Sequence, residues 1–171
     1  MKNYEEIQNI MNQTSKIKYP KIPNLYPNTR YARMLYNDFA GSKGELTAVT
    51  QYIYEHINYN YDPELSKILL QIAIEEMRHI DILGEIIKKL GENPIYVNSE
   101  KKPWTSENVT YHFHSIDEML EYNVMAEDAA IIGYKNAIKY TKNIYLKNIF
   151  ERIILDEEKH KEIFTKLQTK I

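Results

Sequence analysis

The 171-residue sequence contains no cysteine. Disulfides, zinc–thiolate sites, iron–sulfur clusters and iron held by four thiolates are therefore excluded, because each of them needs cysteine sulfur. Any metal ion that the chain binds must be held by aspartate, glutamate and histidine side chains.

Glycine and proline are scarce, with five and six residues respectively. They fall mostly outside the segments in which apolar residues recur at helical spacing, and the alternation typical of strands is rare. Hydrophobic residues make up 43% of the chain, which is enough for a core of ordinary size. We expect one domain of mainly helical structure.

Neither sign of charge is in large excess, because 22 Lys+Arg residues face 24 Asp+Glu residues. No block of basic residues could follow a phosphate backbone, so nucleic acid is not expected as a partner. The longest apolar runs are far too short to cross a membrane, and the first residues lack the apolar segment of a signal peptide. We expect no membrane partner and a cytoplasmic location.

Apolar spacing and capping residues predict four long helices. In the first of them Gly41 and Gly44 interrupt the pattern without changing its phase. The connection between the second and third helices is too long for a tight turn. Two short loops and one long crossover are typical of a ferritin-like four-helix bundle, an all-α fold. The predicted helices lie at residues 30–59, 62–91, 115–140 and 142–170, with the crossover at 92–115.

Residues 1–29 are expected to form an N-terminal arm that packs on the bundle of residues 30–171. The apolar residues Tyr4, Ile7, Ile10 and Met11 share one face of a short amphipathic helix. The prolines at positions 20, 23 and 27 then favour extended backbone.

The second helix pair repeats the first. At an offset of 81 residues, the Glu-x-x-His motif at Glu76 and His79 matches the motif at Glu157 and His160. At an offset of 82 residues, the solitary Glu45 matches Glu127. Each half of the chain therefore supplies one glutamate followed by a Glu-x-x-His motif.

This repeat predicts a site for two metal ions bridged by carboxylates. A glutamate and a histidine three residues apart project from one helix face and can reach a single ion. One such motif alone is common on solvated helix faces, but two copies in register, flanked by core residues, favour a metal site. Oxygen-rich ligation with one imidazole per ion suits iron or manganese. The predicted ligands are Glu45, Glu76, His79, Glu127, Glu157 and His160.

Further residues are expected to support these ligands. A metal-bound imidazole usually donates its other N–H to a carboxylate, and Asp156 is the candidate partner of His79, as Glu75 is of His160. Tyr52 and Tyr134 each follow a solitary glutamate by seven residues. They either hydrogen-bond ligand carboxylates, with a role in catalysis, or only pack in the core.

Residues 30–169 resemble the ferritin-like di-metal carboxylate superfamily. The segment ELTAVTQY from Glu45 is similar to a ligand helix of bacterioferritins and of manganese catalase-like proteins. The segment EEMRHIDILG from Glu75 resembles the Glu-x-x-His helix of manganese catalases, and DEEKH from Asp156 is more like rubrerythrins.

The resemblance implies chemistry on hydrogen peroxide or dioxygen at a pair of iron or manganese ions. It also implies that Glu76 and either Glu127 or Glu157 are among the bridging or terminal ligands. Rubrerythrins add an iron domain with four cysteines and a further glutamate where this chain has Ala130. The rubrerythrin route for electrons is therefore not expected.

Our leading hypothesis is a manganese catalase-like or rubrerythrin-like oxidoreductase whose small-molecule oxidant is peroxide or dioxygen. A catalase needs no external reductant, whereas a peroxidase would need an electron-donor protein as partner. The alternative is an iron-oxidising or metal-binding protein with a structural or storage role, and a third hypothesis is a metal-free interaction module. A homo-oligomer, dimer or larger, is expected.

Overall fold

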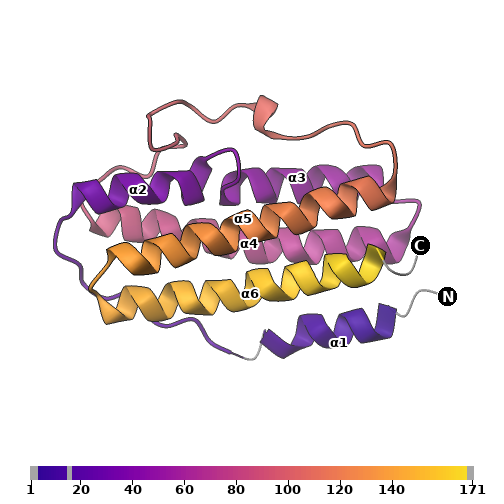
Figure 1. Cartoon of the computed structure of the whole chain (residues 1–171), viewed down its shortest axis with the longest axis horizontal. Coiled ribbons are helices and arrows are strands. Elements are labelled where there is room, and N and C mark those ends of the chain that lie inside the picture. The colour runs from indigo at the N-terminus through magenta and orange to yellow at the C-terminus, as the bar shows by residue number, and fades with distance from the viewer. Residues whose placement is uncertain (1–3, 15–16, 169–171) are drawn as a thin grey trace.

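The computed structural model describes residues 4–14 and 17–168, and it confirms the predicted all-α, ferritin-like bundle. Helix α3 pairs with α4, and α5 pairs with α6, through short loops (Figure 1). One long crossover joins α4 to α5. The helices are α1 (Tyr4–Thr14), α2 (Thr29–Ala40), α3 (Glu45–Asn58), α4 (Pro63–Lys89), α5 (Ile116–Tyr140) and α6 (Ile144–Gln168).

The prediction of one continuous helix over residues 30–59 is wrong. Helix α2 ends at Ala40, α3 begins at Glu45, and the backbone of Gly41 and Gly44 between them is extended. A Cβ atom on either glycine would lie 2.5 Å from the carbonyl oxygen of Asn37, so this turn requires glycine at both positions. The break makes Glu45 the first residue of a new helix.

Polar side chains cap the starts of α4 and α5. The Asp62 side chain accepts a hydrogen bond from the backbone N–H of Leu65 at the start of α4. At the start of α5 Ser115 accepts from the N–H of Glu118. The carboxylate of Glu118 in turn accepts a hydrogen bond from the backbone N–H of His114, the residue before this cap, at 2.6 Å. The predicted end of the last helix at residue 170 lies outside the described residues.

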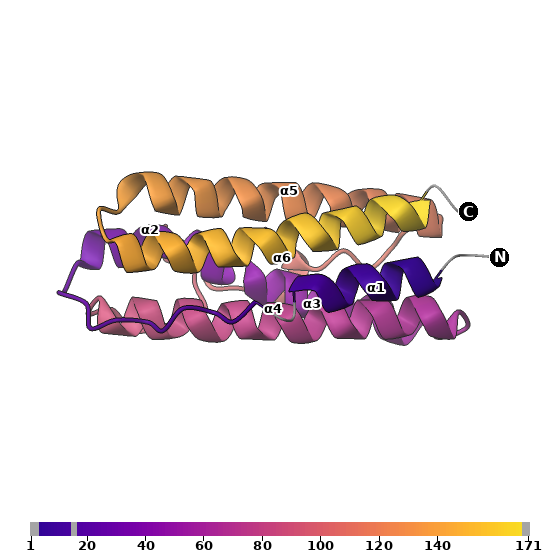
Figure 2. The same ribbon diagram turned by 90° about the horizontal axis from the view of Figure 1, so that it is seen from below.

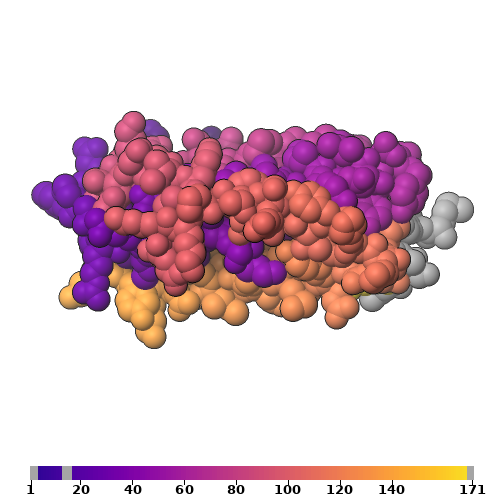
Figure 3. Space-filling model, turned by 90° about the horizontal axis from the view of Figure 1, so that it is seen from above, coloured from indigo at the N-terminus to yellow at the C-terminus, as the bar shows by residue number. Residues whose placement is uncertain are grey.

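The crossover is an irregular segment tied to α3. It contains one 3-10 turn at Ser106–Asn108 and an isolated β-bridge between Val97 and Pro103. The indole N–H of Trp104 donates to the hydroxyl of Thr47 at 2.9 Å. Figure 3 looks onto this face and shows the crossover, in salmon, covering only part of it. The neighbouring surface of α3 and α5 stays open.

Apolar side chains form two core clusters, one toward each end of the bundle. On α4 the first cluster uses residues from Ile82 onward, and the second uses residues up to Ala73. Helix α6 divides in the same way, between Ile154 and Ile163. A polar layer therefore separates the two clusters. Of the described helices, none has an apolar stretch long enough to cross a membrane.

The N-terminal segment lies on the outside of the bundle. Helix α1 packs against α6 and buries Ile7, Ile10 and Met11. From Ile17 the chain continues as an extended arm, residues 17–28, that runs along the side formed by α4 and α6 (Figure 2). Lys89 donates to the carbonyl oxygen of Ile22 at 3.3 Å and helps to hold the arm on the bundle.

Candidate metal centre

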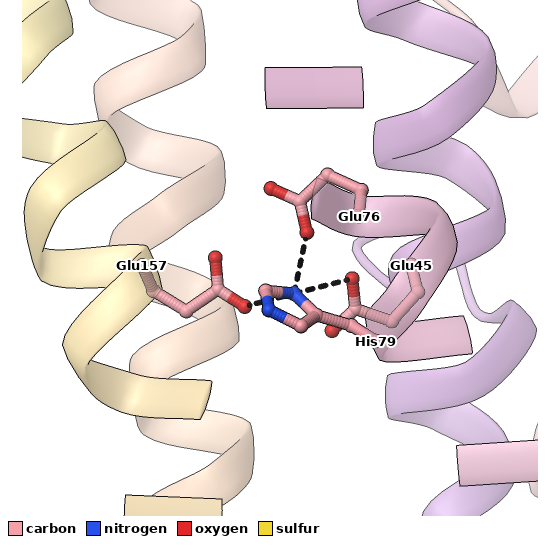
Figure 4. Close-up of side chains that lie close together, drawn as sticks. All are labelled: Glu45, Glu76, His79 and Glu157. Atoms are coloured by element: carbon pink, nitrogen blue, oxygen red, sulfur yellow. Dashed lines mark hydrogen bonds and ion pairs between the residues drawn. The ribbon is translucent and has the colours of Figure 1, made fainter. Parts of the chain in front are cut away.

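The structure brings all six predicted ligand residues together in the polar layer between the two core clusters. Each of them is almost completely buried, with at most 3% of its surface exposed. Their side chains form two groups of four, and within each group the ligand atoms lie within 4.8 Å of one another. The first group, drawn in Figure 4, is Glu45, Glu76, His79 and Glu157, and the second is Glu76, Glu127, Glu157 and His160.

Glu76 and Glu157 belong to both groups and use a different oxygen in each. Oε2 of Glu76 lies 2.8 Å from Nδ1 of His79, and Oε1 lies 2.9 Å from Nδ1 of His160. For Glu157 the corresponding distances are 3.1 Å from Oε1 and 3.4 Å from Oε2. Glu76 and Glu157 are thus in the position of bridging ligands.

The solitary glutamates lie at the two ends of this arrangement. Oε2 of Glu45 is 3.6 Å from Nδ1 of His79, and Oε1 of Glu127 is 3.9 Å from Nδ1 of His160. Each of them belongs to one group only. The resemblance did not decide whether Glu127 or Glu157 accompanies Glu76. In the structure Glu157, and not Glu127, belongs to both groups.

Several polar atoms of this layer lie close to other ligand atoms but make no hydrogen bond of normal geometry with the described residues. They are Oε1 of Glu76, both carboxylate oxygens of Glu157, and Nδ1 of His160. Burying such acceptors without a partner is costly, and a bound cation would remove the cost. Four carboxylates also match the charge of two divalent ions. The donor set therefore fits a metal pair.

The pKa shifts in the site arise from burial and from the negative charge gathered among the ligands. Burial, followed by the charges of Glu76 and Glu157, raises the pKa of both Glu45 and Glu127 well above the ordinary glutamate value. Burial alone would lower the pKa of His79, but the nearby carboxylates, Glu157 first, raise it well above the ordinary histidine value. The buried ligand residues therefore carry an excess of negative charge.

Each tyrosine that the sequence singled out reaches the solitary glutamate of the other half. Tyr52 on α3 donates to Oε1 of Glu127 at 2.5 Å. Tyr134 on α5 donates to Oε1 of Glu45, whose other oxygen faces His79. Both tyrosines are 1% exposed, so they also pack in the core. The two halves are therefore tied together across the site.

The expected outer partners of the histidines lie where the sequence places them. Nε2 of His79 is 3.3 Å from Oδ2 of Asp156, and Nε2 of His160 is 2.9 Å from Oε2 of Glu75.

The structure adds three residues that the sequence did not indicate: Tyr19, Arg152 and Lys159. Arg152 and Lys159 lie one turn before and one turn after Asp156 on α6, so helical spacing could have suggested them.

A narrow passage leads to the ligands between α3 and α5. Its walls carry small residues, among them Gly44, Ala48, Ala126 and Ala130, and its inner end is formed by ligand carboxylates. Its volume is about 30 Å³. One water-sized molecule needs about 10–15 Å³ of such space, so the passage has room for a molecule of about two non-hydrogen atoms. At the exposed end, the ammonium of Lys43 lies 4.4 Å from the ring centre of Tyr122.

Comparison with known proteins links the chain to two kinds of ferritin-like protein. The family model of manganese-containing catalases matches residues 11–103, just over half of the chain. A probable manganese catalase of Clostridium acetobutylicum is 24% identical over 165 residues, which cover 84% of this chain and 72% of that protein. A bacterioferritin of Desulfovibrio desulfuricans is 35% identical over 123 residues, which cover 68% of this chain and 63% of the relative.

Solved structures show the same likeness in the fold. The crystal structure of a manganese catalase from Anabaena superposes with a TM-score of 0.81 at 24% sequence identity. The superposition covers 90% of this chain and 77% of that protein. The Desulfovibrio desulfuricans bacterioferritin gives a TM-score of 0.64 at 29% identity, covering 82% of this chain and 78% of the other.

Proposed function

Because the chain belongs to the manganese-containing catalase family, we propose that it binds two manganese or iron ions and disproportionates hydrogen peroxide to water and dioxygen. The observation that carries the proposal is the shared position of Glu76 and Glu157 between the two histidines. The ligand types suit both metals, and membership of the family favours manganese.

In this reaction two peroxide molecules yield one dioxygen and two waters, with no net demand for electrons. A bound pair of redox-active ions would store the two electrons that pass from one peroxide molecule to the other. The chain contains no cysteine-ligated redox centre, which agrees with a reaction that needs no external reductant. An electron-donor protein would be required only for peroxidase activity.

The protein's own part in this chemistry is to position ligands and to restrict access. Tyr134 holds Oε1 of Glu45, so that Oε2 would stay directed at an ion beside His79. Tyr52 fixes the carboxylate of Glu127 through Oε1, the oxygen that also faces His160. The core clusters on both sides exclude bulk water, which strengthens the electrostatic interactions inside.

Oxygen evolution tests the proposal. Metal-loaded protein should release one dioxygen for every two peroxide molecules consumed, and an added reductant should change neither the rate nor the ratio. Peroxide consumption that depends on reductant and yields no dioxygen would replace the catalase proposal with a peroxidase. Protein that holds two ions and consumes no peroxide would refute both.

Substitution of Ala126 by leucine tests the passage. The longer side chain should fill the small space between α3 and α5 without touching the inner ligands. We expect unchanged metal content and a fall in kcat/KM for peroxide of about tenfold, or about 1.4 kcal/mol of activation free energy. Met125→Leu is the matched control, because Met125 is the preceding residue and is 61% exposed. Equal activity in both variants would mean that substrate enters elsewhere.

A second candidate function is iron oxidation, which the similarity to a bacterioferritin favours. This function predicts rapid consumption of dioxygen when ferrous iron is added, with more than two iron ions oxidised per chain. A catalase that binds two ions would stop after its own site is filled. Counting the ferrous ions oxidised per chain therefore separates the two.

The homo-oligomer and the cytoplasmic location stay predictions from the sequence. Exposed apolar side chains such as Ile74 and Met77 on α4 and Ile132 on α5 agree with contact between copies of the chain. Light scattering of the purified protein gives the mass in solution and tests the first of these predictions.

A further inference from the structure

The two histidines differ in what surrounds the nitrogen that faces away from the carboxylates. Nε2 of His160 meets one acceptor, Oε2 of Glu75 at 2.9 Å, and Lys159 donates to the same oxygen. Nε2 of His79 has two neighbours, the hydroxyl of Tyr19 at 3.1 Å and Oδ2 of Asp156 at 3.3 Å. The two halves of the repeat therefore match in their predicted ligands but differ in the side chains that hydrogen-bond to the histidines.

Tyr19 links the members of the His79 side to one another. Its hydroxyl donates to Oδ2 of Asp156, the same oxygen that lies 2.6 Å from Nη1 of Arg152. The phenol oxygen can then accept the Nε2–H of His79, so the histidine is held by Tyr19 and Asp156, which also bind each other. The ring of Tyr19 also lies against the guanidinium of Arg152, 4.4 Å from its centre. Rotation of the imidazole would break several of these contacts.

The arm, and not the bundle, carries this tyrosine. Tyr19 comes before the repeated helices, so the second half of the chain has no counterpart to it. The arm is held next to it by Arg152, whose Nε donates to the carbonyl oxygen of Ile17 at 2.9 Å. The contacts of Tyr19 and Arg152 therefore both hold the arm on the bundle and orient the ring of His79.

We propose that Tyr19 is a positioning residue for His79, and that the N-terminal arm thereby makes the two metal positions unequal. This inference rests on the metal site of the proposed function, and it does not depend on the reaction performed there. Partners of a ligand histidine typically change metal affinity by about 10- to 100-fold. If the arm strengthens binding of the ion at His79, that ion must strengthen docking of the arm by the same factor.

Metal release after addition of a chelator tests the proposal. In the Tyr19→Phe variant one of the two ions should leave about 10- to 100-fold faster than in the wild type, and the other at the wild-type rate. Tyr26→Phe is the matched control, because Tyr26 lies on the same arm and is 93% exposed. Release of both ions at wild-type rates, or equal acceleration of both, would overturn the proposal.

A variant of the other half identifies which ion has changed. Glu75→Gln weakens the partner of His160 and should accelerate the opposite ion. The double variant should then release both ions fast. If Tyr19→Phe and Glu75→Gln accelerate the same ion, Tyr19 does not act through His79.

Limited proteolysis measures the reciprocal effect on the arm. Trypsin can cleave after the exposed residues Lys18 and Lys21 when the arm leaves the bundle. In the wild type, metal loading should slow this cleavage, and in Tyr19→Phe it should not. Cleavage of the wild-type arm at one rate with and without metal would contradict the linkage. Protein that takes up no metal would refute the proposed function as well, whereas unequal release without catalase activity would refute the reaction alone.

Discussion

Replacement of Glu76 by glutamine is expected to abolish binding of both metal ions. Oxygen evolution from peroxide should fall by about a thousandfold or more, which corresponds to at least about 4 kcal/mol of activation free energy. Each oxygen of Glu76 faces a different histidine, at 2.8 and 2.9 Å. Glutamine keeps the shape of the side chain but offers one carbonyl oxygen and no charge. A single change should therefore affect both halves of the site.

Metal content per chain is the measurement for this variant, with helical content from circular dichroism as the check on folding. Glu64→Gln is the matched control, because it makes the same chemical change at an exposed position of the same helix. The control should keep its metal and its activity. Retention of two ions by Glu76→Gln would refute the assignment of Glu76 as the shared ligand.

Replacement of Glu55 by glutamine is expected to change the free energy of unfolding in a way that depends on pH. The difference between variant and wild type should shift in favour of the variant by roughly 5 kcal/mol between low pH and pH 8. Glu55 is fully buried outside the metal site, where burial raises the pKa of its carboxyl from 4.5 to about 8, although hydrogen bonds from Asn123 and Gln51 oppose the shift. The side-chain oxygen of Asn123 accepts no hydrogen bond from the part of the chain that the structure describes. Rotation of that amide would let it accept from a protonated carboxyl, or from an amide at position 55.

The sign of this effect follows from the direction of the shift. Between pH 4.5 and 8 the unfolded chain has lost the proton of Glu55 while the folded chain retains it. The contribution of Glu55 to the free energy of unfolding therefore falls by about 1.4 kcal/mol per pH unit in this window, and it is complete only below pH 4.5. Glutamine does not titrate, so the variant lacks this slope.

Urea unfolding at several pH values, with equal metal content, gives the difference between variant and wild type. Burial also raises the pKa of Asp38, to about 7. Because Asp38 is present in both proteins, its contribution cancels from that difference. Glu121→Gln, an exposed substitution on α5, should give a difference that does not change with pH. A constant difference for Glu55→Gln as well would show that Glu55 is ionised in the folded protein throughout the window.

The sequence predicted the bundle and the meeting of the six site residues because both depend on regular spacing. Glu76 and His79 share a helix face by their separation alone, and the repeat brings Glu157 and His160 into the matching position. The same spacing anticipated the contacts of Asp156 and Glu75 with the histidines. Helical periodicity carries this information without any knowledge of the loops.

Other features depend on contacts that periodicity does not contain. The break between α2 and α3 keeps the apolar pattern in phase across Gly41 and Gly44, so a continuous helix looked equally consistent. The bridging position of Glu157, as opposed to Glu127, depends on how α4 and α6 face each other. Tyr19 reaches Asp156 across 137 positions of sequence from an extended arm, where no helical spacing applies.

The central claim is that six side chains from four helices hold two metal ions. Anomalous X-ray scattering from crystals of the purified protein, measured at the manganese and iron absorption edges, tests it most directly. The expected result is two peaks per chain, one beside Nδ1 of His79 and one beside Nδ1 of His160, with Glu76 and Glu157 in contact with both. A single peak, or peaks away from these residues, would contradict the account.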